Sequence, residues 1–477
     1  MTEIKIRNFK EISYDELEEL NLAVKHEVLA GTPHDELKAR FLKHLQEERQ
    51  IKAVTVCFSD IEGRFHMLDY DKKHLLASHE GLTFDGSSIR GFSIQSESDL
   101  RLDLDWSSFR WLPSDVFGPG KVLLFAFVCD RDGSPYAGDF RGRLRGVEQQ
   151  LAERGQASAA AFEIEGFLFK GINAEQSFDP NVGFEFVSEG GYFHSLPVTP
   201  LKAFIDHFAE AQRALGFENE KDHPEVAPSQ FELNYAPAPA VIAADQVQLY
   251  KLLARQIATS MGFTASFLPK PRTAINGSGM HTNLSISSGE RNLMFDPQGT
   301  EQLSSFAWSF VDNILQHALD LCLIMNPSVN AYRRLDPHYE APNQVRVSAV
   351  DRSAMIRIPL GTPRSARIEI RSVAPDANPY LLLTALLSLG MQPTPPLDTQ
   401  TRQRRDLVLP SHIQEALTSF EASTHMARIL GEEPRTKYAA LKRAAAQRSP
   451  HELGTRIKSG EVLFHHEVTN QYIWSRF

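Results

Sequence analysis

The chain has 477 residues, of which 42% are hydrophobic and 23% are charged, a composition typical of a globular protein large enough for two domains. Its 50 lysine and arginine residues against 60 aspartate and glutamate residues give a formal net charge of −10, which argues against nucleic acid as a partner. The first residues form no apolar signal segment and the longest apolar run, around residues 381–391, is too short to span a bilayer, so we expect a cytoplasmic protein without a membrane partner.

The predicted elements divide the chain into three parts. Residues 1–48 are rich in Glu, Lys and Leu at helical spacing and predict an extension of one or two amphipathic helices. Residues 49–137 predict a small β-rich domain with strands at 51–58 and 121–128. Residues 138–477 predict a larger domain of mixed strands and helices, with helices at 142–154, 199–216, 242–262, 301–325 and after about residue 410. The predicted fold class is therefore α+β.

Three cysteines occur in the chain, and each lies in an apolar segment without a CxxC spacing. Buried thiols of this kind are more often structural than reactive. We therefore expect reduced core residues at Cys57, Cys129 and Cys322.

Charged residues occupy strand-like segments where apolar residues are expected. Because side chains alternate across a strand, Glu163 and Glu165 share one face, while Phe162 and Ile164 share the other. A pair of carboxylates on the inner face of a sheet repels itself and is costly to desolvate. This pattern therefore predicts a metal ion or several cations beside the pair.

Further acids extend this set. In residues 230–235 the same alternation places Glu232 on one face together with Gln230 and Asn234. Carboxylates with one imidazole and no thiolate favour Mg²⁺ or Mn²⁺ over zinc. A single glutamate is more often a salt-bridge partner, so the prediction rests on the joint pattern. The predicted metal ligands are Glu163, Glu165, Glu225, Glu232, His281 and Glu369.

Several arginines follow within residues 334–371. Two of them, Arg357 and Arg371, lie in strand-like apolar contexts, where an unpaired guanidinium would be costly. Arginine binds carboxylate or phosphate with two parallel hydrogen bonds, so a polyphosphate and a carboxylate substrate would satisfy them. A structural network of arginines and glutamates is an equally weighted alternative.

The usual phosphate-binding motifs are absent from the sequence. It contains no GxxxxGK[ST] and no GxGxxG after a predicted strand, which argues against P-loop and Rossmann sites. Residues 276–279 form instead a glycine loop that allows close approach to a small ligand just before His281. Residues 85–88 are either an ordinary turn or a turn whose Asp85 holds a cation.

These features belong to an ordered series of motifs from about residue 50 to the C-terminus. The series comprises Phe84-Asp85-Gly86-Ser87-Ser88, Glu163-x-Glu165, Gly190-Gly191-Tyr192-Phe193, Glu225-x4-Gln230-x-Glu232, Asn276-Gly277-Ser278-Gly279-Met280-His281, Asn326-Pro327, Tyr339-Glu340-Ala341-Pro342, Arg352-Ser353, Arg367-x-Glu369-x-Arg371 and Asn378-Pro379-Tyr380. In order and spacing it resembles type I glutamine synthetase. The resemblance implies a β-grasp-like N-terminal domain and a catalytic domain built on a curved antiparallel sheet.

The resemblance also implies roles for individual residues. One metal ion would be held by Glu165, Glu225 and Glu232, and a second by Glu163, His281 and Glu369. Glutamate would be bound by Asn276, Gly277, Gly279, Arg334 and Arg371, and ATP by Asn283, Ser285, Arg352, Arg357 and Arg367. The catalytic set would be Asp85 as the ammonium-site acid reaching into a neighbouring subunit's site, Tyr192 beside it, Glu340 as the flap acid, and Arg352.

The implied reaction is ATP-dependent ligation of ammonia to glutamate through γ-glutamyl phosphate, with two or three Mg²⁺ or Mn²⁺ ions per site. The implied assembly is a homo-dodecamer of two hexameric rings with active sites between subunits. Ligation of an organic amine such as a polyamine, an alkylamine or ethanolamine is an alternative, because His338 lies beside the flap and the 223–229 loop is altered. A scaffold without catalysis is a weaker alternative, since it would have no reason to retain the acids.

Among the departures from the family pattern, three lie close to the implied site. Pro224 replaces a usual His and Ser229 a common Gly, so the family resemblance does not define the geometry of the loop beside the first metal. Asp351 replaces a usual Asn next to Arg352, so we expect it to weaken nucleotide affinity.

Overall fold

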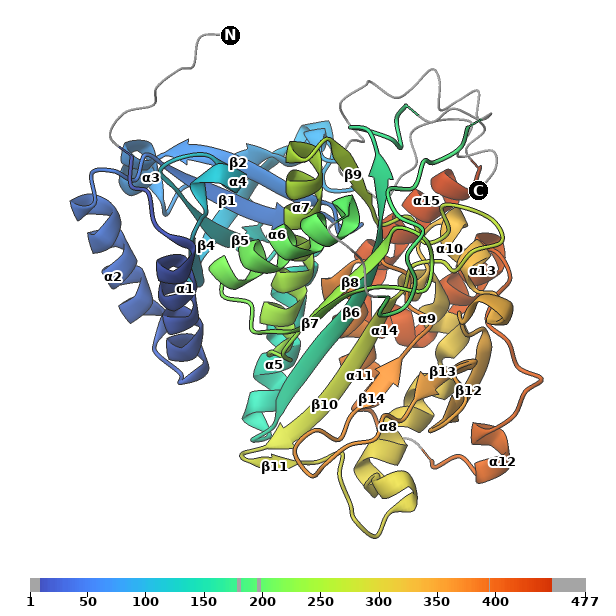
Figure 1. The fold of residues 1–477 in the computed structure, drawn as a ribbon. Coiled ribbons are helices and arrows are strands. Elements are labelled where there is room, and N and C mark those ends of the chain that lie inside the picture. The colour runs from blue at the N-terminus through green and yellow to red at the C-terminus, as the bar shows by residue number, and fades with distance from the viewer. Residues whose placement is uncertain (1–8, 178–181, 195–198, 394, 448–477) are drawn as a thin grey trace.

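The computed structural model describes residues 9–177, 182–194, 199–393 and 395–447, which fold around two sheets (Figure 1). The smaller sheet has five strands in the order β2-β1-β5-β4-β3. Strands β1 and β5 pair in parallel, and the other neighbours are antiparallel. The strands predicted at 51–58 and 121–128 are both present. The strands are β1 Ala53–Ser59, β2 Phe65–Asp71, β3 Thr83–Asp85, β4 Asp99–Trp111 and β5 Lys121–Cys129.

The larger sheet has nine strands and carries the charged residues discussed above. Its main path runs β12-β13-β14-β10-β6-β8-β7, with β11 paired to β10 and β9 paired to β6. All its pairs are antiparallel except β12 with β13, so the predicted antiparallel sheet contains one parallel pair. The strands are β6 Ala157–Lys170, β7 Asn219–Pro224, β8 Gln230–Tyr235, β9 Phe263–Ser266, β10 Met280–Ser288, β11 Arg291–Asn292, β12 Gln344–Ser348, β13 Ala354–Arg357 and β14 Ile368–Ile370.

Helices pack around the two sheets. The helix α11 is enclosed by other helices and is almost entirely buried, as its continuous apolar sequence requires. No described helix is both long enough and apolar enough to cross a membrane. The helices of this part are α3 Lys72–Ser78, α4 Ser114–Phe117, α5 Phe140–Glu153, α6 Pro200–Ala214, α7 Ala240–Ser260, α8 Ser305–Gln316, α9 Ala318–Met325, α10 Val329–Arg334, α11 Pro379–Gly390, α12 Thr399–Arg402, α13 Ile413–Ala422, α14 Thr424–Leu430 and α15 Glu432–Gln447.

The single helix predicted at 301–325 is wrong in two respects. Its first residues are not α-helical, because Ser304 accepts a hydrogen bond from the Ala307 amide and caps α8, while Glu301 has a positive φ of 53°. The chain then leaves helical geometry at His317, where φ is −108°, and α9 begins at the next residue.

The N-terminal extension forms two helices, α1 Tyr14–Leu29 and α2 His34–Glu47. Helix α1 packs against both β4 and α6, so it joins the smaller sheet to the larger domain (Figure 1). Its buried Asn21 donates to the carbonyls of Trp111 and Ala214, and its side-chain oxygen accepts from the Trp111 amide at 3.0 Å. The extension is therefore a bridge between the two parts of the chain.

All three cysteines are free, as expected. Cys57 and Cys322 are buried, and Cys129 is half-buried. Burial raises the pKa of Cys129 to about 11 and that of Cys322 to about 12, so both are thiols at neutral pH.

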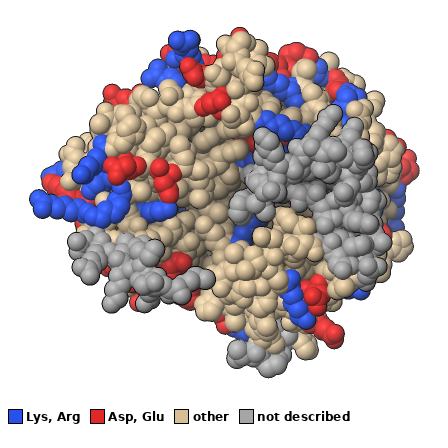
Figure 2. All heavy atoms as spheres, turned by 90° about the horizontal axis from the view of Figure 1, so that it is seen from above, with Lys and Arg blue, Asp and Glu red and all other residues tan. Residues whose placement is uncertain are grey.

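The surface carries charges of both signs. On the face seen from above, basic and acidic side chains mix around the rim (Figure 2).

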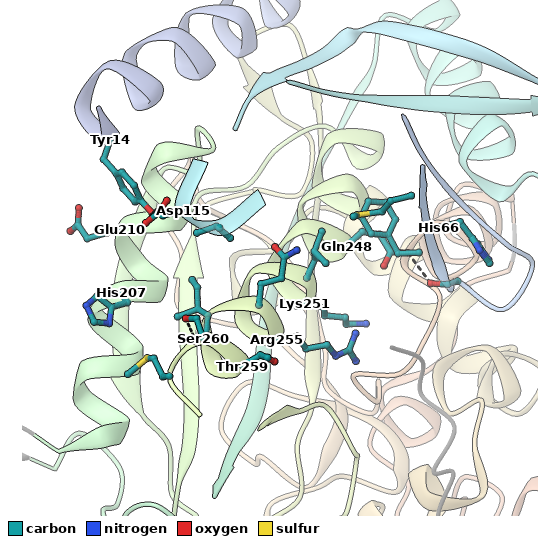
Figure 3. A pocket seen from close by; sticks show the side chains of 18 residues that line it. Tyr14, His66, Asp115, His207, Glu210, Gln248, Lys251, Arg255, Thr259 and Ser260 are labelled. Carbon is teal, nitrogen blue, oxygen red and sulfur yellow. Dashed lines mark hydrogen bonds between the residues drawn. The ribbon is translucent and has the colours of Figure 1, made fainter. Parts of the chain in front are cut away.

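A cavity of about 1030 Å³ lies between α1, α4, β2, α6 and α7 (Figure 3). Its walls are largely apolar, with Phe65, Met67 and Leu252 among them. Lys251 also lines it and is 2% exposed, with no hydrogen-bond partner for its Nζ atom. None of the acids in the predicted metal set lines this cavity.

Candidate functional site

The register of the larger sheet gathers the predicted ligands on one face. In β6, Phe162 and Ile164 are buried, whereas Glu163 and Glu165 are half-buried on the opposite side, as the alternation predicts. Three neighbouring strands then place a functional residue opposite each acid. The pairs are Glu163 with His281, Glu165 with Glu232, and Glu369 with both Asn283 and Arg357.

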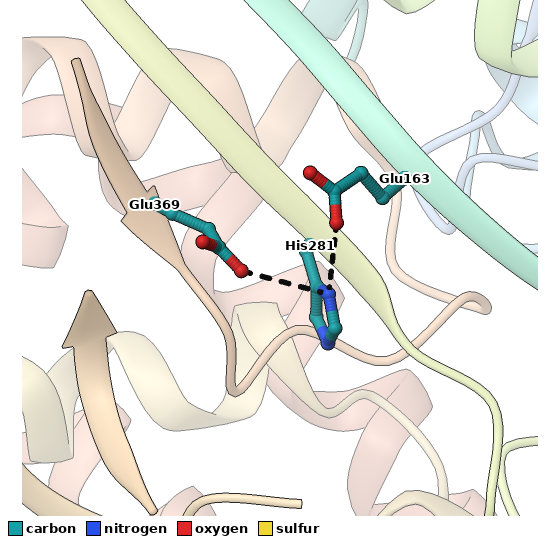
Figure 4. Close-up of side chains that lie close together, drawn as sticks. All are labelled: Glu163, His281 and Glu369. Atoms are coloured by element: carbon teal, nitrogen blue, oxygen red, sulfur yellow. Dashed lines mark hydrogen bonds and ion pairs between the residues drawn. The ribbon is translucent and has the colours of Figure 1, made fainter. Parts of the chain in front are cut away.

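One acid cluster consists of Glu163, His281 and Glu369 (Figure 4). The Nδ1 atom of His281 lies 3.4 Å from a Glu163 oxygen and 3.7 Å from a Glu369 oxygen. One ligand atom from each residue lies within 4.8 Å of the other two. These are the three residues predicted for the second metal ion, and they come together as that prediction requires.

A second cluster consists of His223, Glu225 and Glu232. The two nitrogens of His223 lie 3.6 Å from a Glu225 oxygen and 3.5 Å from a Glu232 oxygen. Sequence reasoning missed His223 as a candidate ligand and proposed Glu165 as the third member. The position of His223 follows from the antiparallel pairing of β7 with β8, which sets His223 opposite Glu232.

Glu165 lies between the two clusters. One oxygen is 4.0 Å from Nε2 of His281, and the other accepts hydrogen bonds from the Gly279 amide at 2.7 Å and from Gln230 at 3.3 Å. This position allows Glu165 to reach an ion in either cluster.

The electrostatics of the second cluster fit a bound cation. Burial, reinforced by the charges of Glu165 and Glu232, raises the pKa of Glu225 to about 9. The buried Nε2 atom of His223 has no hydrogen-bond partner. A divalent cation would remove the repulsion and use this nitrogen, and carboxylate oxygens with imidazole suit Mg²⁺ or Mn²⁺.

Arginines lie along the edge of the first cluster. Arg357 donates to one Glu369 oxygen at 2.7 Å, and Arg371 donates to the other at 3.0 Å. This is the glutamate network that sequence analysis gave as the alternative, and it surrounds a predicted metal ligand. Arg352 is exposed at the rim, where its carbonyl accepts a hydrogen bond from Arg371.

The predicted nucleotide residues lie further along β10. Asn283 donates to Glu163 at 3.1 Å and accepts from Arg367 at 2.9 Å, so it connects an acid of the first cluster to an arginine. Ser285 follows two residues later, on the same face of the strand.

The glycine loop packs directly on Arg334. A Cβ atom on Gly277 would lie 2.3 Å from the Pro269 carbonyl oxygen, and one on Gly279 would lie 2.5 Å from an Arg334 nitrogen. Arg334 is 2% exposed, and its Nη1 atom has no hydrogen-bond partner. A buried guanidinium with an unused donor fits a carboxylate ligand.

Glu340 is held over this loop. Its carboxylate accepts a hydrogen bond from Asn276 at 2.9 Å, and its backbone is left-handed with φ of 61°. The predicted flap acid and a predicted glutamate-binding residue are therefore in direct contact.

Tyr192 and Asp85 occupy different surroundings. Tyr192 is 49% exposed and stacks on Phe193 at 4.0 Å, and the Phe193 ring meets His223 edge-on at 4.7 Å. Asp85 is exposed on β3 of the smaller sheet, where it accepts hydrogen bonds from Ser87 and Ser88. Within the described part of one chain, Asp85 contacts neither cluster.

The structure gives Asp351 partners of its own, and its expected effect on nucleotide affinity stays a prediction. Its carboxylate accepts hydrogen bonds from the amide and hydroxyl of Ser353 and pairs with Arg346, and these contacts lower its pKa to about 2. The positive charge of Arg346 therefore offsets the negative charge of Asp351, which lies next to Arg352 in the chain.

Comparison with known families gives two matches. Residues 50–131 match the glutamine synthetase β-grasp domain, and residues 137–456 match the glutamine synthetase catalytic domain. The chain is 34% identical over 437 residues to glutamine synthetase of Thermotoga maritima, covering 88% of this chain and 98% of that protein. It is 34% identical over 412 residues to glutamine synthetase of Methanosarcina mazei, covering 83% and 91%.

Solved structures show the same fold. Plasmodium falciparum glutamine synthetase, determined by cryo-electron microscopy, superposes with a TM-score of 0.76 at 20% identity, covering 88% of this chain and 97% of that one. A protein named GmaS, solved without ligand, superposes with a TM-score of 0.71 at 25% identity, covering 86% and 98%.

Proposed function

The chain belongs to the glutamine synthetase family of carbon-nitrogen ligases, and we propose that it joins ammonia to the side-chain carboxylate of glutamate, forming glutamine, ADP and phosphate. One observation carries the proposal. Two clusters of acids and imidazole, a buried arginine and a glycine loop meet on one face of a single sheet.

The first step activates a carboxylate, which is a poor electrophile by itself. We assign glutamate to Arg334 and the Asn276–Gly279 loop, where the unused guanidinium donor would bind a carboxylate of the substrate. An oxygen of the glutamate side chain bonds to the γ-phosphorus of ATP, and the bond from that phosphorus to ADP breaks. Arg352 and Arg357 would offset the charge that moves, and Arg367, Asn283 and Ser285 would position the nucleotide.

Two or three Mg²⁺ or Mn²⁺ ions would be held by the two clusters together with Glu165. When bound, such ions neutralise phosphate charge and align the phosphates for transfer.

The second step needs neutral ammonia. Ammonium must lose a proton before its nitrogen bonds to the acyl carbon and phosphate leaves with the C–O bond electrons. We assign the acceptance of that proton to Glu340, which lies beside the glutamate loop, and the binding of the ammonium cation to Asp85 of a neighbouring subunit. With Glu340 bonded to Asn276, the flap also restricts the access of water to the acyl phosphate.

An organic amine is the second candidate for the acceptor. The stacked, exposed rings of Tyr192 and Phe193 beside the second cluster offer an apolar and cation-binding surface for an alkylammonium group. The retention of Asp85 and Glu340 favours ammonium. A scaffold without catalysis is disfavoured, because the clustered acids cost free energy of folding unless a cation binds them.

The test is phosphate release from ATP by the purified protein with glutamate and Mg²⁺. Ammonium is compared with methylamine, ethanolamine, putrescine and spermidine, and Glu369→Gln serves as the control for contaminating ATPases. Saturation by ammonium at the lowest concentration supports the proposal. Turnover with an organic amine but not with ammonium would show that the acceptor is that amine. The absence of turnover with ammonium and with every amine would contradict ligase activity.

A further inference from the structure

Ser229 occupies an unusual position between two segments of the candidate site. It is fully buried, with 0% exposure, and its backbone is left-handed with φ of 60°. Such a conformation is unfavourable for a residue with a Cβ atom, and serine gains nothing from it unless its side chain is needed there.

The Ser229 hydroxyl uses its full hydrogen-bonding capacity. Its Oγ atom accepts from the amides of Val187 at 2.7 Å and Ser188 at 2.9 Å, and it donates to the Ser188 carbonyl at 3.0 Å. Three hydrogen bonds therefore tie the 225–230 loop to the segment 184–193.

Each of these two segments carries a part of the site. The 225–230 loop holds Glu225 of the second cluster. The segment 184–193 begins with Phe184, which is buried against Phe169 at 4.2 Å between ring centroids, and it ends with the exposed Tyr192 and Phe193.

The connection continues from Ser229 to the aromatic pair. The Ser188 hydroxyl accepts from the Gly190 amide at 3.1 Å, and the Phe193 amide donates to the Pro224 carbonyl at 3.4 Å. The described segment is irregular here, so the Ser229 hydrogen bonds help to fix the backbone that leads to the aromatic pair.

We propose that Ser229 is a positioning residue that sets the aromatic pair Tyr192 and Phe193 relative to the metal-ligand loop, and thereby sets the binding of the acceptor amine. The role rests on the proposed function, with the acceptor amine bound beside Tyr192, the residue that the family resemblance sets next to the ammonium site. Ser229 itself does not touch the reacting atoms.

The test compares Ser229→Ala with Ser229→Gly. Both variants lose the hydroxyl, but glycine also relieves the left-handed backbone, so the two differ in stability and share the loss of the hydrogen bonds. Glu301→Gly is the matched control, because Glu301 also has a positive φ, of 53°, and lies exposed outside the site.

The first readout needs no substrate. Hydrogen exchange followed by mass spectrometry should show faster exchange in peptides covering residues 184–193 in both Ser229 variants, by about tenfold or more, and unchanged exchange there in Glu301→Gly. Unchanged exchange in the Ser229 variants would overturn the proposal. This readout does not depend on the reaction. An inactive parent protein would therefore count against the proposed function and not against the connection that Ser229 makes between the two segments.

The second readout is steady-state kinetics with the acceptor found for the parent protein. We expect KM for the amine to rise about tenfold in both Ser229 variants, with KM for ATP changed less than about twofold. An equal increase in KM for the amine in both variants, despite their different stability, would assign the effect to the loss of the hydroxyl. Faster exchange with an unchanged KM for the amine, or a common rise in both KM values, would overturn the positioning role.

Discussion

At the scale of single residues, the glycine loop has the least tolerance for change. Gly277 has no room for a Cβ atom, because the Pro269 carbonyl oxygen would lie 2.3 Å away and Arg334 would be the next contact. The loop backbone must therefore lie close to the guanidinium, and no side chain can separate them.

Gly277→Ala should raise KM for glutamate by about tenfold or more, because the loop must move away from Arg334. Gly146→Ala is the control, since a Cβ atom there meets nothing within 4 Å, and it should leave the kinetics unchanged. Kinetics with glutamate as the varied substrate check the prediction. An unchanged KM in Gly277→Ala would remove this loop from the glutamate site.

Lys251 should make stability depend on pH. Burial, with the nearby charge of Arg255, lowers its pKa to about 7, so between pH 7 and about 10.5 the unfolded chain binds a proton that the folded chain does not. Stability from this group therefore rises with pH in that window. In Lys251→Met the gain in unfolding free energy from pH 7 to pH 9 should shrink by about 2 kcal/mol.

Urea denaturation at the two pH values measures this effect. Lys43→Met is the control, because the Lys43 side chain is 74% exposed and should leave the pH dependence unchanged. If the unfolding free energy depends on pH equally in Lys251→Met and in the parent protein, Lys251 is charged in the folded protein.

Residue types and spacing predicted most of the site residues but not their partners. Glu163 and Glu369 were predictable from charge inside apolar strands, and His281 followed the glycine loop. His223 was missed because its ligand position depends on pairing between β7 and β8, a contact between strands that one strand's pattern does not contain. The pairing of Asp351 with Arg346 was missed for a similar reason, because it depends on how a turn folds back on β12.

At the scale of elements, the sequence predicts strands and helices with strong periodicity but not the points where a helix is interrupted. The alternation in β6 and the apolar run of β5 predicted their strands, since burial of one or both faces decides them. The break between α8 and α9 at His317 has no glycine or proline to mark it, so the sequence suggested a continuous helix. The contacts of the N-terminal helices were equally hidden, because they are made with residues distant in sequence.

Asn21 tests the bridge that α1 forms. Asn21→Ala should lower the free energy of unfolding by about 2–4 kcal/mol, because it removes three hydrogen bonds and leaves the buried amide of Trp111 without its acceptor. Chemical denaturation measures the change, with the exposed Glu19→Ala on the same helix as control. A decrease in unfolding free energy no larger than that of the control would show that α1 does not stabilise the contact between the smaller sheet and the larger domain.

At the scale of the whole molecule, the chain holds most of its candidate site within itself but separates one acid from it. Asp85 lies on the five-stranded sheet, exposed and hydrogen-bonded to its own turn, while both acid clusters lie on the nine-stranded sheet. An ammonium-site role for Asp85 therefore requires a second subunit, and the proposed ring of subunits would supply it.

Mixing two inactive variants distinguishes a shared site from a site within one chain. Asp85→Ala should impair ammonium use and Glu369→Gln should abolish the first cluster, so each protein alone should be nearly inactive. If Asp85 serves a neighbour's site, some interfaces of a mixed oligomer combine an intact Asp85 from one subunit with an intact Glu369 from the next. Random mixing then restores about a quarter of the parent activity. If Asp85 acts within its own chain, every site carries one of the two substitutions and mixing restores nothing. Co-expression with two affinity tags isolates the mixed oligomers, and oligomers of each variant with the parent protein are the controls for subunit exchange. Recovered turnover would establish both the assembly and the place of Asp85, because neither property alone produces it.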